Sequence, residues 1–101
     1  EFITEIPTEF RLEQNYPNPF NPNTIIRYTV PNVTLRGVER VRVQLRVYDV
    51  LGNEVATLVD EYKPSGIYDV QFTPNNLSSG IYFYQLKAGN YSQSKKMTIL
   101  K

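Results

Sequence analysis

The side chains that enzymes most often use for chemistry are scarce in this chain. Histidine and cysteine are both absent, which removes the commonest general base, the reactive thiol and the usual metal ligands. Carboxylates remain, but Asp49 precedes Gly52 and Asp60 adjoins Glu61, contexts that we interpret as solvated turns. No paired acids can be placed across a cleft, and no glycine loop for phosphate is present. The sequence therefore predicts no enzyme activity, no metal and no other cofactor.

Basic side chains are the second candidates for a functional surface. They form a group in the middle of the chain and a group at its end: Arg36, Arg40, Arg42 and Arg46, then Lys95, Lys96 and Lys101. Each group is interpreted either as a solvated strand face or as a surface that attracts anionic lipopolysaccharide or an acidic protein. The chain has 11 basic and 10 acidic residues, so it lacks the field that general nucleic-acid binding needs.

Tyrosines raise the alternative of a carbohydrate-binding module, although the chain has no tryptophan. Four of them alternate with polar or exposed positions and are predicted to lie in the core: Tyr28, Tyr68, Tyr82 and Tyr84. Tyr48, Tyr62 and Tyr91 remain as outward-facing candidates. A sugar platform requires these three rings to share one face.

Strands, rather than helices, must position these side chains. Apolar residues recur with a period of two, and β-branched and aromatic residues dominate among them. The runs predict an irregular first strand at 10–16 and further strands at 26–30, 41–48, 54–62, 68–72, 82–86 and 91–101. The run 54–62 is the least regular and is predicted to be a bulged or edge strand. In the last run, Met97 and Ile99 are expected to point inward.

Glycines separate these runs, as turns with positive φ require. Short strands punctuated at short intervals are typical of an antiparallel sandwich. We therefore predict an all-β fold, an antiparallel immunoglobulin-like β-sandwich of about seven strands.

The segment "QNYPNPFNPNT" fits neither a helix nor a central strand. Its prolines, Pro17, Pro19 and Pro22, fix φ and restrict the residues before them to extended conformations. Prolines also donate no ladder hydrogen bond, which places the segment along an edge or across an end of the sandwich. We expect Tyr16 and Phe20 to pin it onto the core. The same stiff segment is also suited to be an exposed recognition epitope, and the two roles are compatible.

A chain of 101 residues corresponds to one domain. Residues 1–8 are predicted to be a linker, with a candidate cloning scar at Glu1 and Phe2, and residues 9–101 to be the folded domain. Because the chain starts without methionine, we expect it to be a fragment or a processed product. No apolar run is long enough to predict a membrane span.

Four blocks in order resemble the type A C-terminal sorting domain of the type IX secretion system. They are "LEQNYPNPFNPNTIIRYTVP", "VRVQLRVYDVLGNEVATLVD", "GIYDVQF" and "LSSGIYFYQLKAGNYSQSKKMTILK". The resemblance covers about residues 9–101 and ends at a lysine-rich strand. It implies an immunoglobulin-like sandwich that directs an attached N-terminal cargo protein from the periplasm across the outer membrane.

The resemblance also implies partners and motif residues. The partners are a type IX secretion receptor or translocon and a sortase-like surface peptidase, which removes the domain by cleavage at about 1–13. The cargo is then released or stays at the cell surface. The motif residues carried onto this chain are Tyr16, Pro17, Asn18, Pro19, Phe20, Asp49, Gly52, Gly80, Tyr82, Lys95, Lys96 and Lys101.

One departure and two rivals accompany this resemblance. The connection "NVTLRGVER", residues 32–40, is longer than the turn expected there, so it is either a loop extension or an added edge strand. One rival is a structural or adhesive sandwich, such as the related domain of flagellar hook-capping proteins. The other is the accessory carbohydrate-binding module of a secreted protein.

Overall fold

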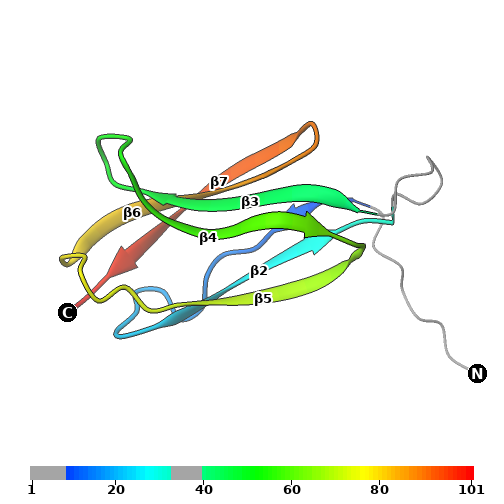
Figure 1. Cartoon of the computed structure of the whole chain (residues 1–101). Coiled ribbons are helices and arrows are strands. Elements are labelled where there is room, and N and C mark those ends of the chain that lie inside the picture. The colour runs from blue at the N-terminus through cyan, green and yellow to red at the C-terminus, as the bar shows by residue number, and fades with distance from the viewer. Residues whose placement is uncertain (1–8, 33–39) are drawn as a thin grey trace, which may run out of the picture.

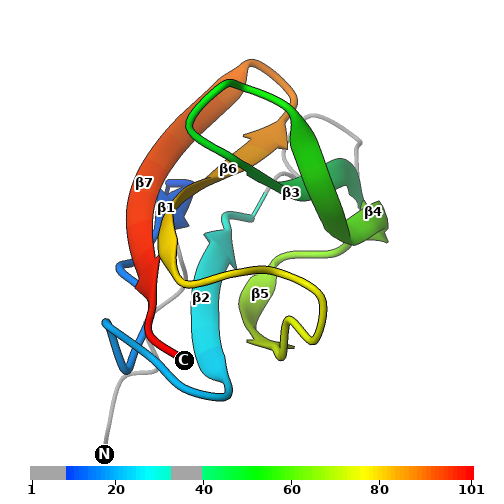
Figure 2. The ribbon, with the colours of Figure 1, turned by 90° about the vertical axis from the view of Figure 1, so that its left-hand side faces the viewer.

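Two antiparallel β-sheets make up the described structure. A computed structural model of the chain describes residues 9–32 and 40–101. Its strands are β1 (Arg11–Leu12), β2 (Thr24–Val30), β3 (Val41–Tyr48), β4 (Glu54–Lys63), β5 (Gly66–Phe72), β6 (Gly80–Ala88) and β7 (Tyr91–Ile99). Sheet A has the order β1-β2-β5, and sheet B has the order β4-β3-β6-β7. The sheets stack as two layers (Figure 1), and β7 and β4 lie on opposite sides of sheet B (Figure 2).

Alternation of apolar and polar side chains gives each inner strand two faces. In β3, Val43, Leu45 and Val47 are fully buried, whereas Gln44 and Arg46 between them reach the outer surface. Successive side chains of a strand point to opposite faces of the sheet, so the apolar set faces sheet A. The strand predicted at 41–48 is confirmed.

The core lies between the two sheets and takes apolar side chains from both. Sheet A and the segment before it contribute Leu12, Phe20, Ile26, Tyr28, Val30 and Phe72. Sheet B contributes Val43, Leu45, Val47, Val59, Tyr82, Tyr84, Leu86, Ala88, Met97 and Ile99. Met97 and Ile99 point inward as predicted, and so do Tyr28, Tyr82 and Tyr84. Tyr68 is only half-buried and stacks on Tyr28, with 5.2 Å between the ring centroids.

β4 is the edge of sheet B, and its pairing with β3 is irregular. The register shifts between Leu45 and Arg46 and again between Val47 and Tyr48. The predicted bulged edge strand is therefore confirmed. The prediction that Asp60 and Glu61 form a turn is wrong, because β4 continues to Lys63 and both acids are exposed along this edge strand.

The antiparallel β-sandwich of seven strands is confirmed. Counted in chain order, a constant-type immunoglobulin domain pairs strands 1-2-5-4 in one sheet and 3-6-7 in the other. The present fold shares the pairs 1-2-5 and 3-6-7, but its fourth strand joins the third. The short turn at 49–53 accounts for this difference, since it makes β3 and β4 a direct hairpin. Most of the 32–40 connection lies outside the described residues.

Two leucines offer a matched test of this core. Leu45 is fully buried in β3, whereas Leu51 in the β3–β4 turn is 82% exposed. We expect Leu45→Ala to lower the free energy of unfolding by about 2–5 kcal/mol, because it removes packed methyl groups and leaves a cavity. Leu51→Ala should change it by no more than about 0.5 kcal/mol. Urea denaturation followed by circular dichroism measures both, and equal effects would contradict the assigned core.

Candidate functional site

The proline-rich segment lies along the last strand of the chain. We call residues 13–20 the leading segment. Near its end, the amide of Phe20 donates to the carbonyl oxygen of Thr98 at 3.1 Å, and the amide of Leu100 donates to the carbonyl oxygen of Phe20 at 3.0 Å. Phe20 thus forms a parallel bridge with Ile99. The motif residues of the leading segment and those of the last strand are far apart in the chain, but they lie along one edge of the sandwich.

Side chains of the leading segment extend this contact with β7. The Asn18 Oδ1 accepts a hydrogen bond from the Thr98 amide at 3.0 Å, and the Gln14 Nε2 donates to the Lys96 carbonyl oxygen at 2.7 Å. The outer edge of β7 is therefore engaged from residue 96 to residue 100. A receptor could not bind this half of β7 by adding a strand to its edge, because the leading segment already occupies it.

A buried polar cluster fixes the start of the leading segment. Tyr84 in β6 donates its hydroxyl to the Glu13 carbonyl oxygen at 2.6 Å and accepts the Asn15 amide at 2.8 Å. The Asn15 Nδ2 donates to Thr24 Oγ1 at 3.0 Å, and that hydroxyl donates to the Pro17 carbonyl oxygen at 2.8 Å. Asn15 and Thr24 are buried, so these bonds satisfy groups that would otherwise be costly to bury.

Sequence reasoning missed this cluster, although Thr24 carried a signal for it. Inward-facing positions of β2 alternate through Ile26, Tyr28 and Val30, so Thr24 falls on the core side of the same strand. A polar residue at an inward position requires a hydrogen-bond partner inside the protein. The sequence alone does not say that the partners are Asn15 and Pro17, which are close only after the chain turns back.

The two aromatic rings of the leading segment differ in burial. Phe20 is buried and lies 6.1 Å from Phe72, ring centroid to ring centroid, as predicted. Tyr16 is 80% exposed, so the expectation that it pins the segment onto the core is wrong. Its backbone pairs with that of Ile25, whose side chain also points outward, and this register turns the Tyr16 ring to solvent.

Asp49 and Gly52 build the β3–β4 turn, as predicted. The Asp49 carboxylate accepts the amides of Leu51 and Asn53, each at 2.9 Å, and the Asn53 side-chain amide at 3.2 Å. These donors, Asn53 first, lower the pKa of Asp49 from its usual value. Gly52 has a φ of +88°, a conformation that other residues rarely adopt.

The remaining motif residues divide into buried and exposed ones. Gly80 begins β6, and Tyr82 beside it is buried and donates its hydroxyl to the Ser78 carbonyl oxygen at 2.9 Å. Pro17, Asn18, Pro19, Lys96 and Lys101 are exposed, and Lys95 is half-buried. Gly80 pairs with Ile99 near the end of β7, and both lie at the same end of the sandwich as the β3–β4 turn, on the left in Figure 1.

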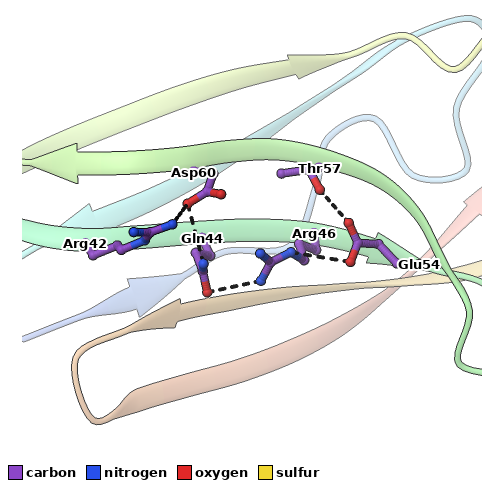
Figure 3. A network of polar contacts seen from close by, with 6 residues as sticks. All are labelled: Arg42, Gln44, Arg46, Glu54, Thr57 and Asp60. Carbon is purple, nitrogen blue, oxygen red and sulfur yellow. Dashed lines mark hydrogen bonds and ion pairs between the residues drawn. The ribbon is translucent and has the colours of Figure 1, made fainter.

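The arginines of sheet B are paired with acids rather than free. On the outer face, Arg42 lies 2.7 Å from Asp60 and Arg46 lies 3.4 Å from Glu54, with Gln44 and Thr57 completing the network (Figure 3). The hydrogen bond from Arg42 lowers the pKa of Asp60. Arg40 is exposed, and Arg36 lies outside the described residues. This pairing weakens the suggestion that the arginine cluster attracts an anion.

The three candidate tyrosines do not come together as an aromatic platform for sugars. Tyr48 and Tyr62 lie at opposite ends of β3 and β4, since Tyr48 is opposite Glu54 whereas Tyr62 is opposite Arg42. Tyr91 instead stacks on Phe10, with ring centroids 5.2 Å apart. The described residues, 9–32 and 40–101, contain no group of side chains that could hold a metal ion. None of them forms a helix long and apolar enough to cross a membrane.

Tyr84 offers a test of how the leading segment is held. Tyr84→Phe leaves the Asn15 amide and the Glu13 carbonyl without their partner, so we expect a loss of about 1–3 kcal/mol in the free energy of unfolding at neutral pH. Tyr16→Phe, in the same segment but exposed, should have no such effect. Urea denaturation of both variants distinguishes a held segment from one that lies loosely on the surface.

Alkaline pH provides an independent check on the same side chain. Burial raises the pKa of Tyr84 to about 12 and that of Tyr28 also to about 12. An unfolded tyrosine has a pKa of about 10, so the folded state retains these protons to higher pH. The stability contributed by both neutral tyrosines should therefore be complete below about pH 10 and fall between about pH 10 and 12. The free energy of unfolding of Tyr84→Phe should fall less over the same pH range, because this variant has one buried tyrosine fewer.

Comparison with known proteins agrees with the architecture. A protein-family model described as "Secretion system C-terminal sorting domain" matches residues 14–100, which include β2 to β7 and nearly all of the leading segment. No curated protein and no solved structure matches the chain. Members of the matched family are non-catalytic sorting signals of type IX secretion. The chain belongs to the family of secretion system C-terminal sorting domains.

Proposed function

We propose that the leading segment and β7 act together as a two-part address that a type IX secretion receptor reads. One observation carries this proposal: Phe20 pairs with Ile99, so the first and last sequence motifs share one edge of the sandwich. A receptor that contacts this edge meets both motifs only when the domain is folded. An unfolded cargo tail would present the two motifs far apart along the chain.

The exposed members of the motifs are the residues that a receptor can contact. On the leading segment these are Tyr16, Pro17, Asn18 and Pro19, and on the terminal part of the chain they are Lys96 and Lys101. Rigid prolines reduce the entropy lost on binding, and lysines attract an acidic surface. Phe20, Asp49, Gly52, Gly80 and Tyr82 act indirectly by building the fold that presents these side chains.

The route of export follows from this role. The attached cargo enters the periplasm, crosses the outer membrane by the type IX translocon and reaches the cell surface or the medium. A sortase-like surface peptidase then removes the domain, which itself performs no catalysis.

Lysine substitutions test the address without disturbing the core. A secreted reporter fused before residues 1–101 and expressed in a type IX host should reach the cell surface. The double variant Lys96→Gln with Lys101→Gln should lower the surface fraction by about fivefold, because two exposed charges worth about 1 kcal/mol together are lost from the receptor contact. Lys87→Gln, an exposed lysine on β6 outside the motifs, is the matched control.

Two outcomes of this experiment oppose the proposal. Retention of the unaltered fusion in the periplasm would exclude the sorting role of this chain. Surface display of both the double lysine variant and a fusion lacking residues 97–101, each at the level of the unaltered fusion, would exclude a role for the terminal strand.

The position of cleavage is a further prediction. Leu12 is buried, Phe10 stacks on Tyr91, and the Glu13 amide donates to the Arg27 carbonyl oxygen at 3.0 Å. A peptidase needs an accessible extended chain, so cleavage within 10–13 would require these contacts to break. We expect the bond to lie before Phe10, which narrows the earlier range of 1–13. Mass spectrometry of the released domain measures its first residue, and a fragment that begins at Arg11 or later would contradict this.

A further inference from the structure

Large apolar side chains are exposed at one end of the outer face of sheet B. We call this surface the distal patch and define it by Tyr48, Val50, Leu51, Ile81 and Phe83. Leu51 is 82% exposed, Val50 66%, Ile81 44% and Phe83 38%. Tyr48 is directly opposite Phe83 in the β3–β6 ladder, and Ile81 is the next residue on the same face of β6. Val50 and Leu51 follow Tyr48 in the turn.

The fold does not require these side chains to be apolar. On the inner face of the same strands, Val47, Tyr82 and Tyr84 already fill the core. Farther along the outer face, Gln85 is paired opposite Arg46 and Lys87 opposite Gln44, so the neighbouring part of this surface is polar. At the far end of the same face Tyr62 is exposed, so the group of several exposed apolar side chains belongs to the end that carries the turn. Exposed large apolar side chains grouped at one end of a sheet are a feature of interaction surfaces.

The free charge beside the distal patch is positive. Lys96 is opposite Phe83 in the β6–β7 ladder, and Lys101 follows the end of β7. Residues 70–101 contain four lysines and no Asp or Glu, and none of these lysines forms an ion pair with another described residue. The nearest acids are engaged: Glu54 contacts Arg46, and Asp49 accepts the hydrogen bonds of the turn.

We propose that the distal patch binds a protein of the secretion apparatus whose surface carries an apolar pocket bordered by carboxylates. This inference rests on the proposed function. Leu51, at the tip of the turn, enters the pocket. Phe83 and Tyr48 cover its rim, and Lys96 meets a carboxylate of the partner. A large side chain inserted in a pocket, surrounded by aromatic residues and a charge at the margin, is the arrangement of an interface hot spot.

Two other occupants fit the patch less well. In a symmetric pair of copies of this chain, the acids available to Lys96 would be Asp49, whose oxygens accept the hydrogen bonds of the turn, and Glu54, which contacts Arg46. A bilayer surface usually attracts clusters of about 4–8 basic residues, whereas only Lys96 and Lys101 stand beside this patch. A protein pocket needs one well-placed charge.

The turn residues allow a test that leaves the core intact. In the reporter fusion carrying the full chain, Leu51→Asp and Val50→Asp should each lower the surface fraction by about tenfold or more, because a carboxylate cannot enter an apolar pocket bordered by acids. Ile67→Asp is the matched control, since Ile67 is 62% exposed but lies on β5 of sheet A. Thermal melting of the three purified variants should match that of the unaltered chain.

Each outcome decides a different question. If the unaltered fusion is exported and Leu51→Asp and Val50→Asp are exported equally well, the docking inference is wrong and the sorting function stands. If Ile67→Asp fails as they do, the effect is not specific to the patch and the inference is also wrong. If the unaltered fusion is not exported, the proposed function and the inference fall together.

A vesicle experiment separates a protein partner from a lipid one. The purified chain is mixed with vesicles of phosphatidylcholine and phosphatidylglycerol in equal parts and centrifuged through a density gradient. We expect the chain to stay at the bottom. Flotation that Leu51→Asp abolishes would assign the patch to an anionic bilayer and overturn the protein pocket.

Discussion

The pairing of the leading segment with β7 is the contact on which the rest of the arrangement depends. A strand at the edge of a sheet exposes unpaired amides and carbonyls that can bind another chain. Here Phe20 and Asn18 occupy those groups on Thr98 and Leu100, and prolines ensure that the added segment cannot itself recruit a further strand. Tyr84 holds the start of the same segment from inside the sandwich. One set of hydrogen bonds thus closes the sheet and joins both ends of the motif set.

This arrangement separates residues that build the domain from residues that a partner can contact. Asp49 and Gly52 shape a turn, and Phe20 and Tyr82 fill the core, so their substitution would act through folding. Tyr16 and Lys96 are exposed and contribute little to packing. A short sequence motif such as "NYPNPF" mixes both kinds, since Asn15 and Phe20 at its two ends are buried and the four residues between them are exposed. Loss of export after substitution therefore has to be read together with stability.

Local sequence patterns were enough to predict the strands but not the contacts between them. Alternation over 41–48 and 82–86 identifies β3 and β6, because one buried face imposes a period of two. It does not give the register that places Arg42 beside Asp60, nor the one that turns Tyr16 outward opposite Ile25. Those depend on which strands pair, a property of the whole chain. The exposure of Leu51 could not be predicted from the sequence either, because an apolar residue in a turn can also be buried under a neighbouring loop.

The position of the cargo connection explains how one domain can serve as a general address. Phe10 stacks on Tyr91 beside the β6–β7 turn, at the end of the sandwich opposite the β3–β4 turn and the end of β7 (Figure 1). Nearly the whole length of β6 separates these two ends. Ala88 pairs with Tyr91 at the end that carries Phe10, and Gly80 pairs with Ile99 at the other end. A cargo that precedes Phe10 therefore joins the domain at the end opposite Lys101 and the distal patch. The strands fix that separation, so a receptor that read the proposed address at one end would bind independently of what is attached at the other.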